Sequence, residues 1–181
     1  AVLAVMMAFA LAGCGGSQGS TAAPSSSGGG TPAVEYDTEL NVAVAQEAPS
    51  LDLHKNSSLI ARQIMQGTVY EKLVTLNSES EVIPELAESY EMSEDAKTFV
   101  FHLRSGVRFH DGSVMDADDV VASMNRWIAN FSVVKEFAGN SRFEKIDDAT
   151  VRIVFDHPAV TFPDIVAGAA QPAAITTAEA T

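Results

Sequence analysis

The sequence has little of what three common classes of protein require. Its single cysteine, Cys14, has no partner for a disulfide within the chain, so a disulfide-rich scaffold is excluded. Only 11 Lys and Arg stand against 24 Asp and Glu, and the formal net charge of −13 would repel nucleic-acid phosphates. No uninterrupted apolar run reaches the roughly 20 residues that a membrane-spanning helix needs. We therefore expect neither a nucleic-acid partner nor a membrane span.

Residues that could carry catalysis or bind a metal are also sparse. No histidine has an i, i+4 or Cys-x-x-Cys partner; the four are His54, His102, His110 and His157. His54 lies near Asp52 without a second ligand at metal spacing, so we interpret it as a surface or hydrogen-bonded side chain. The G-x-S-x-G pattern at 15–19 lacks the strand and helix that a nucleophile elbow needs. We predict no catalytic residue, no metal site and no cofactor.

The first 34 residues contain no charged side chain and differ from the rest of the chain. Residues 1–12 are apolar and typical of the central part of an export signal, inside which we expect the sequence to begin. Residues 11–14 (LAGC) resemble a bacterial lipobox in which Cys14 carries a lipid; the alternative is a chance cysteine. Residues 15–36, rich in Gly, Ser and Pro, predict a flexible tether with a reach on the order of 25 Å.

The clearest strand pattern lies at residues 98–103 (TFVFHL), where large apolar side chains alternate with other residues. A period of two predicts a half-buried strand. A short amphipathic turn is expected before it, in the stretch that begins at Pro84, and a shorter strand after it, at 107–109. The dipeptide Asp111-Gly112 then predicts a turn.

A helix is predicted to follow at residues 116–131. Asp116 is a suitable N-cap, and Asp118 and Asp119 place negative charge at the positive end of the helix dipole, which explains them better than a calcium loop does. Apolar residues recur there at helical spacing: Val120, Met124, Trp127 and Phe131. The helix should therefore bury one face.

Shorter patterns predict the remaining elements. They are a strand at 40–45, a helix at 58–65, a strand at 70–74, a hairpin of 143–146 with 150–155, and a helix at 163–168. Between 131 and 142 the pattern is weak. The small and polar residues at 46–50 predict a loop at the end of the first strand, where ligands are often bound in sheet folds. A solvent-exposed turn without ligand contact is the alternative.

Several segments follow a specific order of residues. They are LDLHKN at 51–56, VYEKLVTLN at 69–77, PELAESYE at 84–91, FHLRSGVRFHDG at 101–112, ADDVVASMNR at 117–126 and IDDATVRIVF at 146–155. In this order they resemble the family 5 extracellular solute-binding proteins, which include the peptide-, nickel- and glutathione-binding components of bacterial ABC importers. The resemblance covers most of residues 40–165. Leu53 and Asp116 stand where the family often carries Pro and Thr.

The resemblance implies an α/β fold of the periplasmic-binding-protein type II, a two-lobed clamshell of which only the first lobe and an inserted subdomain are present. The implied divisions are 37–67 for the start of lobe I, 68–157 for the inserted subdomain and 158–181 for the return toward lobe I. In the family, the loop after the first strand borders the ligand cleft. The residues that we expect to touch the ligand are therefore Glu47, Ala48, Ser50 and Leu51.

The function implied by the resemblance is capture of short peptides, dipeptides or oligopeptides, outside the membrane. A hinge would close over the ligand, and the closed form would be recognised by the ABC permease subunits. The implied protein is a lipid-anchored monomer on the periplasmic or extracellular face, and nickel or glutathione are the alternative ligands. Two other classes stay open: a secreted hydrolase, for which no nucleophile and base are visible, and a structural or sensory surface lipoprotein with the same tether.

Overall fold

The computed structural model describes residues 41–56 and 58–181, and residues 42–181 form one compact unit. The predicted signal at 1–14, with Cys14, and the predicted tether at 15–36 lie outside the described residues. The divisions at 37–67, 68–157 and 158–181 stay a prediction. Among the helices of the described residues, none combines the length and hydrophobicity that crossing a membrane requires.

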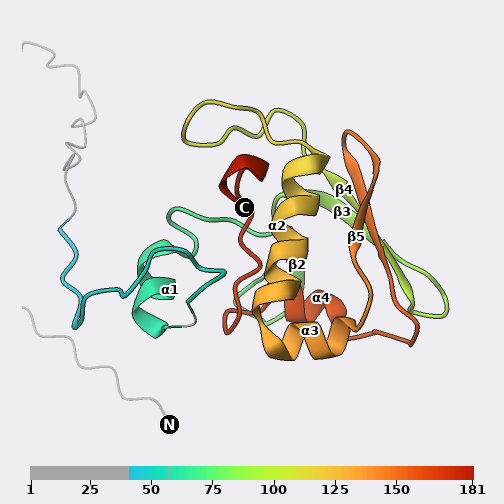
Figure 1. The fold of residues 1–181 in the computed structure, drawn as a ribbon, viewed down its shortest axis with the longest axis horizontal. Coiled ribbons are helices and arrows are strands. Elements are labelled where there is room, and N and C mark those ends of the chain that lie inside the picture. Colours follow the sequence, from blue (N-terminus) through green and yellow to red (C-terminus); the bar gives the residue numbers. More distant parts are fainter. Residues whose placement is uncertain (1–40, 57) are drawn as a thin grey trace, which may run out of the picture. The chain divides into compact units, whose positions relative to one another are not determined.

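The unit contains a four-stranded antiparallel sheet, in the order β3-β4-β6-β5, which lies on the side of the unit away from α1 (Leu59–Met65) (Figure 1). Its strands are β3 (Ala87–Met92), β4 (Thr98–Leu103), β5 (Phe143–Asp147) and β6 (Thr150–Val154). Phe99 pairs with Ile153 and Phe101 with Val151, so these four side chains share one face, which is buried. Val154, on the other face, is exposed. One covered face and one solvated face explain the alternation that predicted β4.

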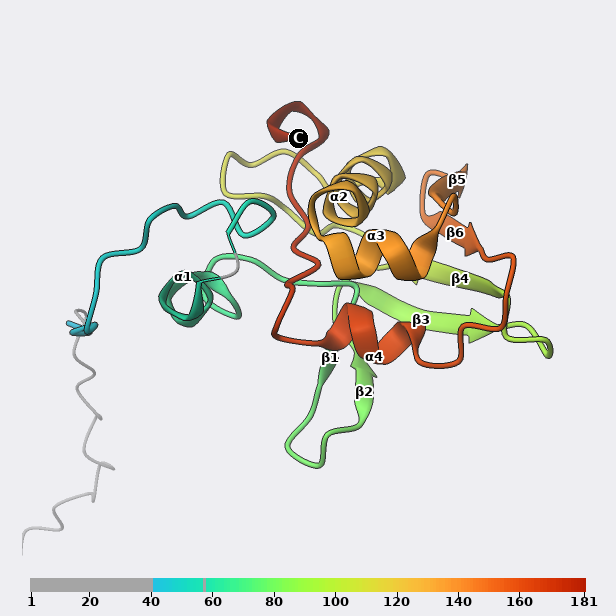
Figure 2. The same ribbon diagram turned by 60° about the horizontal axis from the view of Figure 1, so that its bottom comes forward.

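Helix α2 (Ala117–Asn130) packs against the buried face of the sheet (Figure 2). The Asp116 side chain accepts hydrogen bonds from the backbone N–H groups of Asp118 and Asp119. The Asp119 side chain in turn accepts one from the Asp116 N–H, which completes a capping box. The largest fully buried side chains of the helix are Val120, Met124, Trp127 and Ile128. The predicted helix, its cap and its apolar face are thus confirmed, with Phe131 as the buried C-cap.

Aromatic rings fill the space between the sheet and the helices. The ring of Phe99 lies 5.3 Å from that of Phe162 and 6.0 Å from that of Phe155 between centroids, and Tyr90 stacks on Phe101 at 5.8 Å. Two short helices close this core: α3 (Ser132–Ala138) and α4 (Phe162–Ala167). We call β3–β6 with α2–α4 the helix–sheet layer. Fully burying one such side chain contributes roughly 1.5–3 kcal/mol, so most of the stability resides here.

The remaining elements lie beside this layer. Helix α1 (Leu59–Met65) begins at its N-cap Ser58, as predicted. β1 (Val74–Leu76) and β2 (Val82–Pro84) form a separate hairpin (Figure 2). Arg62 of α1 donates to the carbonyls of Ala169 and Ala170, just beyond the end of α4, at 3.0 and 2.8 Å. The chain ends in a short 3-10 turn, η1 (Ala178–Ala180).

Four predictions of secondary structure are wrong. Residues 41–45 form no strand, and Val42 is 71% exposed, because no described segment pairs with them. The strand expected at 70–74 begins only at Val74, and the one at 107–109 is reduced to a single bridge between Arg108 and Val114. The stretch after Pro84, where a short amphipathic turn was expected, contains the strand β3 from Ala87 to Met92. The hairpin of β5 with β6 and the helix near 163–168 are confirmed, whereas α3 was not anticipated.

Candidate ligand-binding site

The loop at residues 47–56, which we call the 47–56 loop, is shaped by its own short polar side chains. Ser50 Oγ accepts from the Asp52 N–H at 3.2 Å, and Asp52 Oδ1 accepts from the His54 N–H at 3.0 Å. Asn56 Nδ2 donates to the Ser50 carbonyl at 2.8 Å, which brings the two ends of this turn together. Such side-chain bonds to nearby backbone replace the ladder bonds of regular structure. The loop therefore has a defined conformation.

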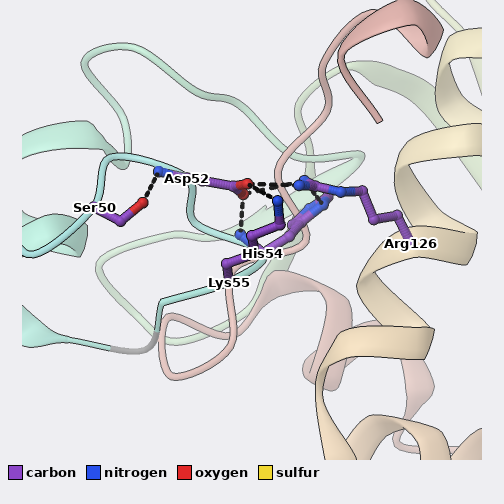
Figure 3. Close-up of polar contacts among 5 residues, drawn as sticks. All are labelled: Ser50, Asp52, His54, Lys55 and Arg126. Atoms are coloured by element: carbon purple, nitrogen blue, oxygen red, sulfur yellow. Dashed lines mark hydrogen bonds and ion pairs between the residues drawn. The ribbon is translucent and has the colours of Figure 1, made fainter.

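Arg126 of α2 joins this loop to the helix–sheet layer (Figure 3). Its Nη1 donates to Asp52 Oδ1 at 3.1 Å and its Nη2 donates to Asp52 Oδ2 at 2.5 Å, a bidentate pair. The same Nη1 lies 3.2 Å from His54 Nδ1. Lys55 is also near, with its Nζ 3.7 Å from Asp52 Oδ2, but its side chain is largely exposed. The ion pair with Arg126 is therefore the stronger restraint.

The charge state of this cluster follows from its surroundings. The hydrogen bond from Arg126 lowers the pKa of the Asp52 carboxyl, against the opposing effect of burial. Burial, followed by the positive charge of Arg126, lowers the pKa of His54 to about 4, although Asp52 favours the protonated form. Because a guanidinium N–H only donates, His54 Nδ1 accepts, and the neutral ring carries its proton on Nε2. At neutral pH, Arg126 and Asp52 are thus charged and His54 is neutral.

α2 also holds the segment 171–178 through residues on one of its faces. Trp127 Nε1 donates to the Gln171 carbonyl at 2.9 Å. Ser123 Oγ donates to the Thr176 carbonyl at 2.9 Å and accepts from the Thr176 N–H at 3.0 Å. Asp119 Oδ1 accepts from the Ala178 N–H at 2.7 Å. These side chains recur every four residues, so the segment runs along the helix beside Arg126.

Two hollows lie along the segment 171–178, and only the first of them also borders the 47–56 loop and α2. The first, of about 190 Å³, is lined by Leu51, Asp52, Leu53, His54, Tyr70, Arg126, Ala174, Thr176 and Ala180. The second, of about 250 Å³, is lined by Val69, Tyr70, Phe109, His110, Asp111, Ile175, Thr176 and Thr177. Tyr70 and Thr176 border both. Apolar and polar side chains both line these hollows, and a small-ligand site uses its polar groups to fix the orientation of the ligand.

The four residues expected to touch a ligand have different surroundings. Leu51 is 52% exposed and lines the first hollow. Ser50 lies one residue away and is used in the loop's own hydrogen bonding. Glu47 is exposed, and Ala48 packs against the small core of Leu53, Ala61, Met65 and Ala174. They share one loop, and their contact with a ligand stays a prediction.

Sequence reasoning missed Arg126 and underrated Asp52 and His54. His54 is not a surface residue: it is 2% exposed, although it is hydrogen-bonded as the alternative reading held. A usable signal existed, since Arg126 is the only basic residue of α2 and directly precedes the buried Trp127. Within residues 41–56 and 58–181, no three His, Cys, Asp or Glu side chains gather as a metal-binding group.

Comparison with known proteins identifies the family. Residues 81–180 match the family described as bacterial extracellular solute-binding proteins, family 5 middle. The dipeptide-binding protein of Escherichia coli K12 is 36% identical over 115 residues, which cover 52% of this chain and 22% of that protein. The glutathione-binding protein GsiB of Escherichia coli O1:K1 is 30% identical over 135 residues, which cover 71% of this chain and 26% of that protein.

The fold is shared with solved periplasmic binding proteins. The structure of AgaA from A. tumefacien R10 in complex with agropinic acid matches with a TM-score of 0.65 and 33% identity, over 74% of this chain and 27% of AgaA. The chain thus spans about a quarter of the length of the curated relatives it matches. From the family match, the identities and the shared α/β fold, this chain belongs to the bacterial extracellular solute-binding proteins of family 5 and has part of their two-lobed fold.

Proposed function

We propose that the protein containing this chain is the substrate-binding component of an ABC importer and captures short peptides outside the membrane. The observation that carries this proposal is the 36% identity to the dipeptide-binding protein of Escherichia coli. Binding rather than catalysis is the role of the family, so the ligand would be held unchanged and passed to the permease subunits. A second candidate ligand is glutathione, favoured by the similarity to GsiB.

The geometry of the 47–56 loop supports a peptide ligand. No backbone hydrogen bond joins residues 41–49 to another described segment, so their main-chain groups are available to the main chain of a peptide. Such strand-like pairing gives affinity without reading side chains. The hollow beside Leu51 and Tyr70 offers space for a side chain of the ligand. A ligand that also contacts an opposing lobe binds the closed form best and shifts the population toward it.

The test is binding by the full-length protein. Thermal-shift screening followed by calorimetry would use dipeptides, tripeptides, glutathione and a nickel chelate as probes. Ligand at a hundredfold excess over Kd stabilises the folded state by about 2.7 kcal/mol, which gives a clear rise in Tm. Peptide binding without cleavage, checked by mass spectrometry, supports the proposal. Cleavage would instead indicate a hydrolase, and the absence of any saturable ligand would indicate a structural or sensory lipoprotein.

We also propose that Cys14 carries a lipid that anchors an exported, monomeric protein at the periplasmic or extracellular face of the membrane. The support is the sequence LAGC between an apolar run and a tether rich in Gly, Ser and Pro. The full-length gene with Cys14→Ser, expressed in a bacterial host with labelled fatty acid, should lose the label and leave the membrane fraction. A matched Ser17→Ala variant in the tether should keep both. Unchanged labelling of the Cys14→Ser protein would contradict the anchor.

A further inference from the structure

The 47–56 loop is fastened to the helix–sheet layer by a side chain that is distant in the sequence. Arg126 reaches Asp52 across 74 residues and donates to both carboxylate oxygens, at 3.1 and 2.5 Å. Its Nη1 also lies 3.2 Å from His54 Nδ1, which accepts a hydrogen bond in the neutral ring. A two-point bond to a planar fork fixes orientation as well as distance. Arg126 therefore determines how the loop is turned relative to α2.

The helix side of this contact is rigid. Trp127, the next residue, is fully buried and donates to the Gln171 carbonyl at 2.9 Å. Asn125, the preceding residue, exchanges two hydrogen bonds with the backbone of Phe143 in β5, at 3.0 and 2.9 Å. Rotation of α2 about its axis would break these contacts on both sides of Arg126. The backbone of Arg126 is therefore held in place, and only 14% of the Arg126 side chain is exposed.

The loop side has few other ties to the layer. The bonds of Ser50 and Asp52 to nearby N–H groups shape the loop but join it to no other element. Leu53 packs with Ala61, Met65 and Ala174, a core of only four buried residues. Within the part of the chain that the structure describes, Asp52 with Arg126 is the ion pair that connects this loop to α2. Loss of that pair would free the loop to turn about Leu53.

We propose that Arg126 is a positioning residue for ligand binding: its fork on Asp52, completed by His54, orients the loop that presents Glu47–Leu51. This inference rests on the proposed function, because it takes the 47–56 loop as part of the ligand site. The effect passes through Asp52 and does not require Arg126 to touch the ligand. A lysine would keep the charge but present a single ammonium, so orientation should depend on the fork and recover only in part.

The experiment measures loop motion and affinity in the same full-length proteins. The variants are Arg126→Ala, Arg126→Lys and Asp52→Asn, with Arg152→Ala as the matched control, since Arg152 pairs with Glu144 on an exposed strand surface. Hydrogen–deuterium exchange measures the exchange rates of the Asp52 and His54 amides in the loop separately from the rates of the amides in β4 and β6. Calorimetry with dipeptides reports Kd. Removing a hydrogen bond to a charged group is expected to raise both the exchange rate of the loop amides and the Kd for dipeptide by about tenfold or more.

The expected result is faster exchange confined to the 47–56 loop and a weaker Kd, both largest for Arg126→Ala, partly rescued in Arg126→Lys, and unchanged in Arg152→Ala. Asp52→Asn removes the same ion pair from the loop side, so it should raise the loop exchange rate and Kd as Arg126→Ala does. Agreement between the two variants would exclude poor folding of one of them as the cause. Exchange that rises equally in β4 and β6 would show a merely structural role and overturn the inference. So would a freed loop with unchanged Kd. Absence of dipeptide binding by the unaltered protein would defeat the proposed function alone, leaving the exchange data to decide whether Arg126 orients the loop.

Discussion

The helix–sheet layer and the 47–56 loop lie side by side but are stabilised by different forces. The layer buries a continuous set of aromatic and aliphatic side chains, whose contribution depends little on pH. The loop depends on short polar bonds, a four-residue apolar core and one ion pair with α2. The layer should therefore respond to lost volume, and the loop to lost charge or added protons. A substitution in one region should leave the other region unchanged, so each region can serve as the reference for the other.

The largest effect is expected from a cavity in the layer. Phe99→Ala removes a fully buried ring that contacts Phe155 and Phe162, and should lower the free energy of unfolding by about 3–5 kcal/mol. Urea denaturation followed by tryptophan fluorescence measures this, because Trp127 lies in the same core. Val154→Ala, on the exposed face of the same sheet, should change it by less than about 0.5 kcal/mol. Equal effects of the two would mean that the layer is not packed as described.

The second-largest effect is expected from low pH, which should reduce the stability of the 47–56 loop. The pKa of His54 is about 4 in the folded protein against 6.5 as the ordinary value, so the unfolded or opened loop binds the extra proton. Stability of the loop is complete above pH 6.5 and falls as pH drops toward 4, by up to about 3 kcal/mol. Protonation would place a second cation beside Arg126, with Asp52 and Lys55 as the other charged neighbours.

The measurement is the exchange rate of the Asp52 and His54 amides, corrected for the intrinsic pH dependence of exchange, at pH 7, 5.5 and 4.5. Amides of β4 and β6 should keep their protection over this range. His54→Gln, whose amide oxygen accepts from Arg126 without titrating, should remove the dependence. A pH dependence that survives this substitution would assign the effect to another group.

A smaller effect is expected at the start of α2. Asp116→Ala removes the side chain that accepts from Asp118 and Asp119, and should cost about 1 kcal/mol. The same urea titration detects it. Asp116→Ser retains a capping oxygen and should recover most of the loss. If alanine and serine behave alike, the capping box contributes nothing measurable.

The smallest effect is expected from an ion pair on the solvated surface of the sheet. Arg152→Ala breaks the contact with Glu144 at 3.0 Å, in which both side chains are about half exposed or more. Such pairs contribute about 0–1 kcal/mol and are screened by salt. The unfolding midpoint should move little, and less still at high salt. A loss comparable to that of Phe99→Ala would contradict the view that the layer is stabilised by apolar burial.

Much of the layer could be predicted from local pattern. The alternation in β4 and the capped helix α2 are visible because the residues that signal them also form the buried face. β3 was missed because it is an edge strand in which only Ala87 is fully buried, so no alternation survives. α3 was missed because its seven residues bury only Val134 and Ala138. The strand at 40–45 was predicted from the alternation of its side chains. Such a local pattern does not show whether another segment is available to pair with it, and no described segment pairs with residues 41–45.

The site could be predicted only in part. The loop was located from its residue types and its place after a supposed strand, and Leu51 does line a hollow. The contact of Asp52 and His54 with Arg126 depends on how α2 is turned against the sheet, which no local pattern reports across 74 residues. The family resemblance indicated where the segments belong, but it did not indicate which side chains meet.

Among the strands of residues 41–56 and 58–181, the order leaves β3 and β5 as the edges of the sheet, where hydrogen-bonding groups face outward. β3 carries the exposed Glu88 and Glu91, and β5 carries the exposed Glu144 and Lys145. Adding a second copy edge to edge at β3 would bring glutamates together on both chains, a repulsion that natural sheets use against aggregation. The arrangement therefore disfavours polymerisation of the protein through the edges of this sheet.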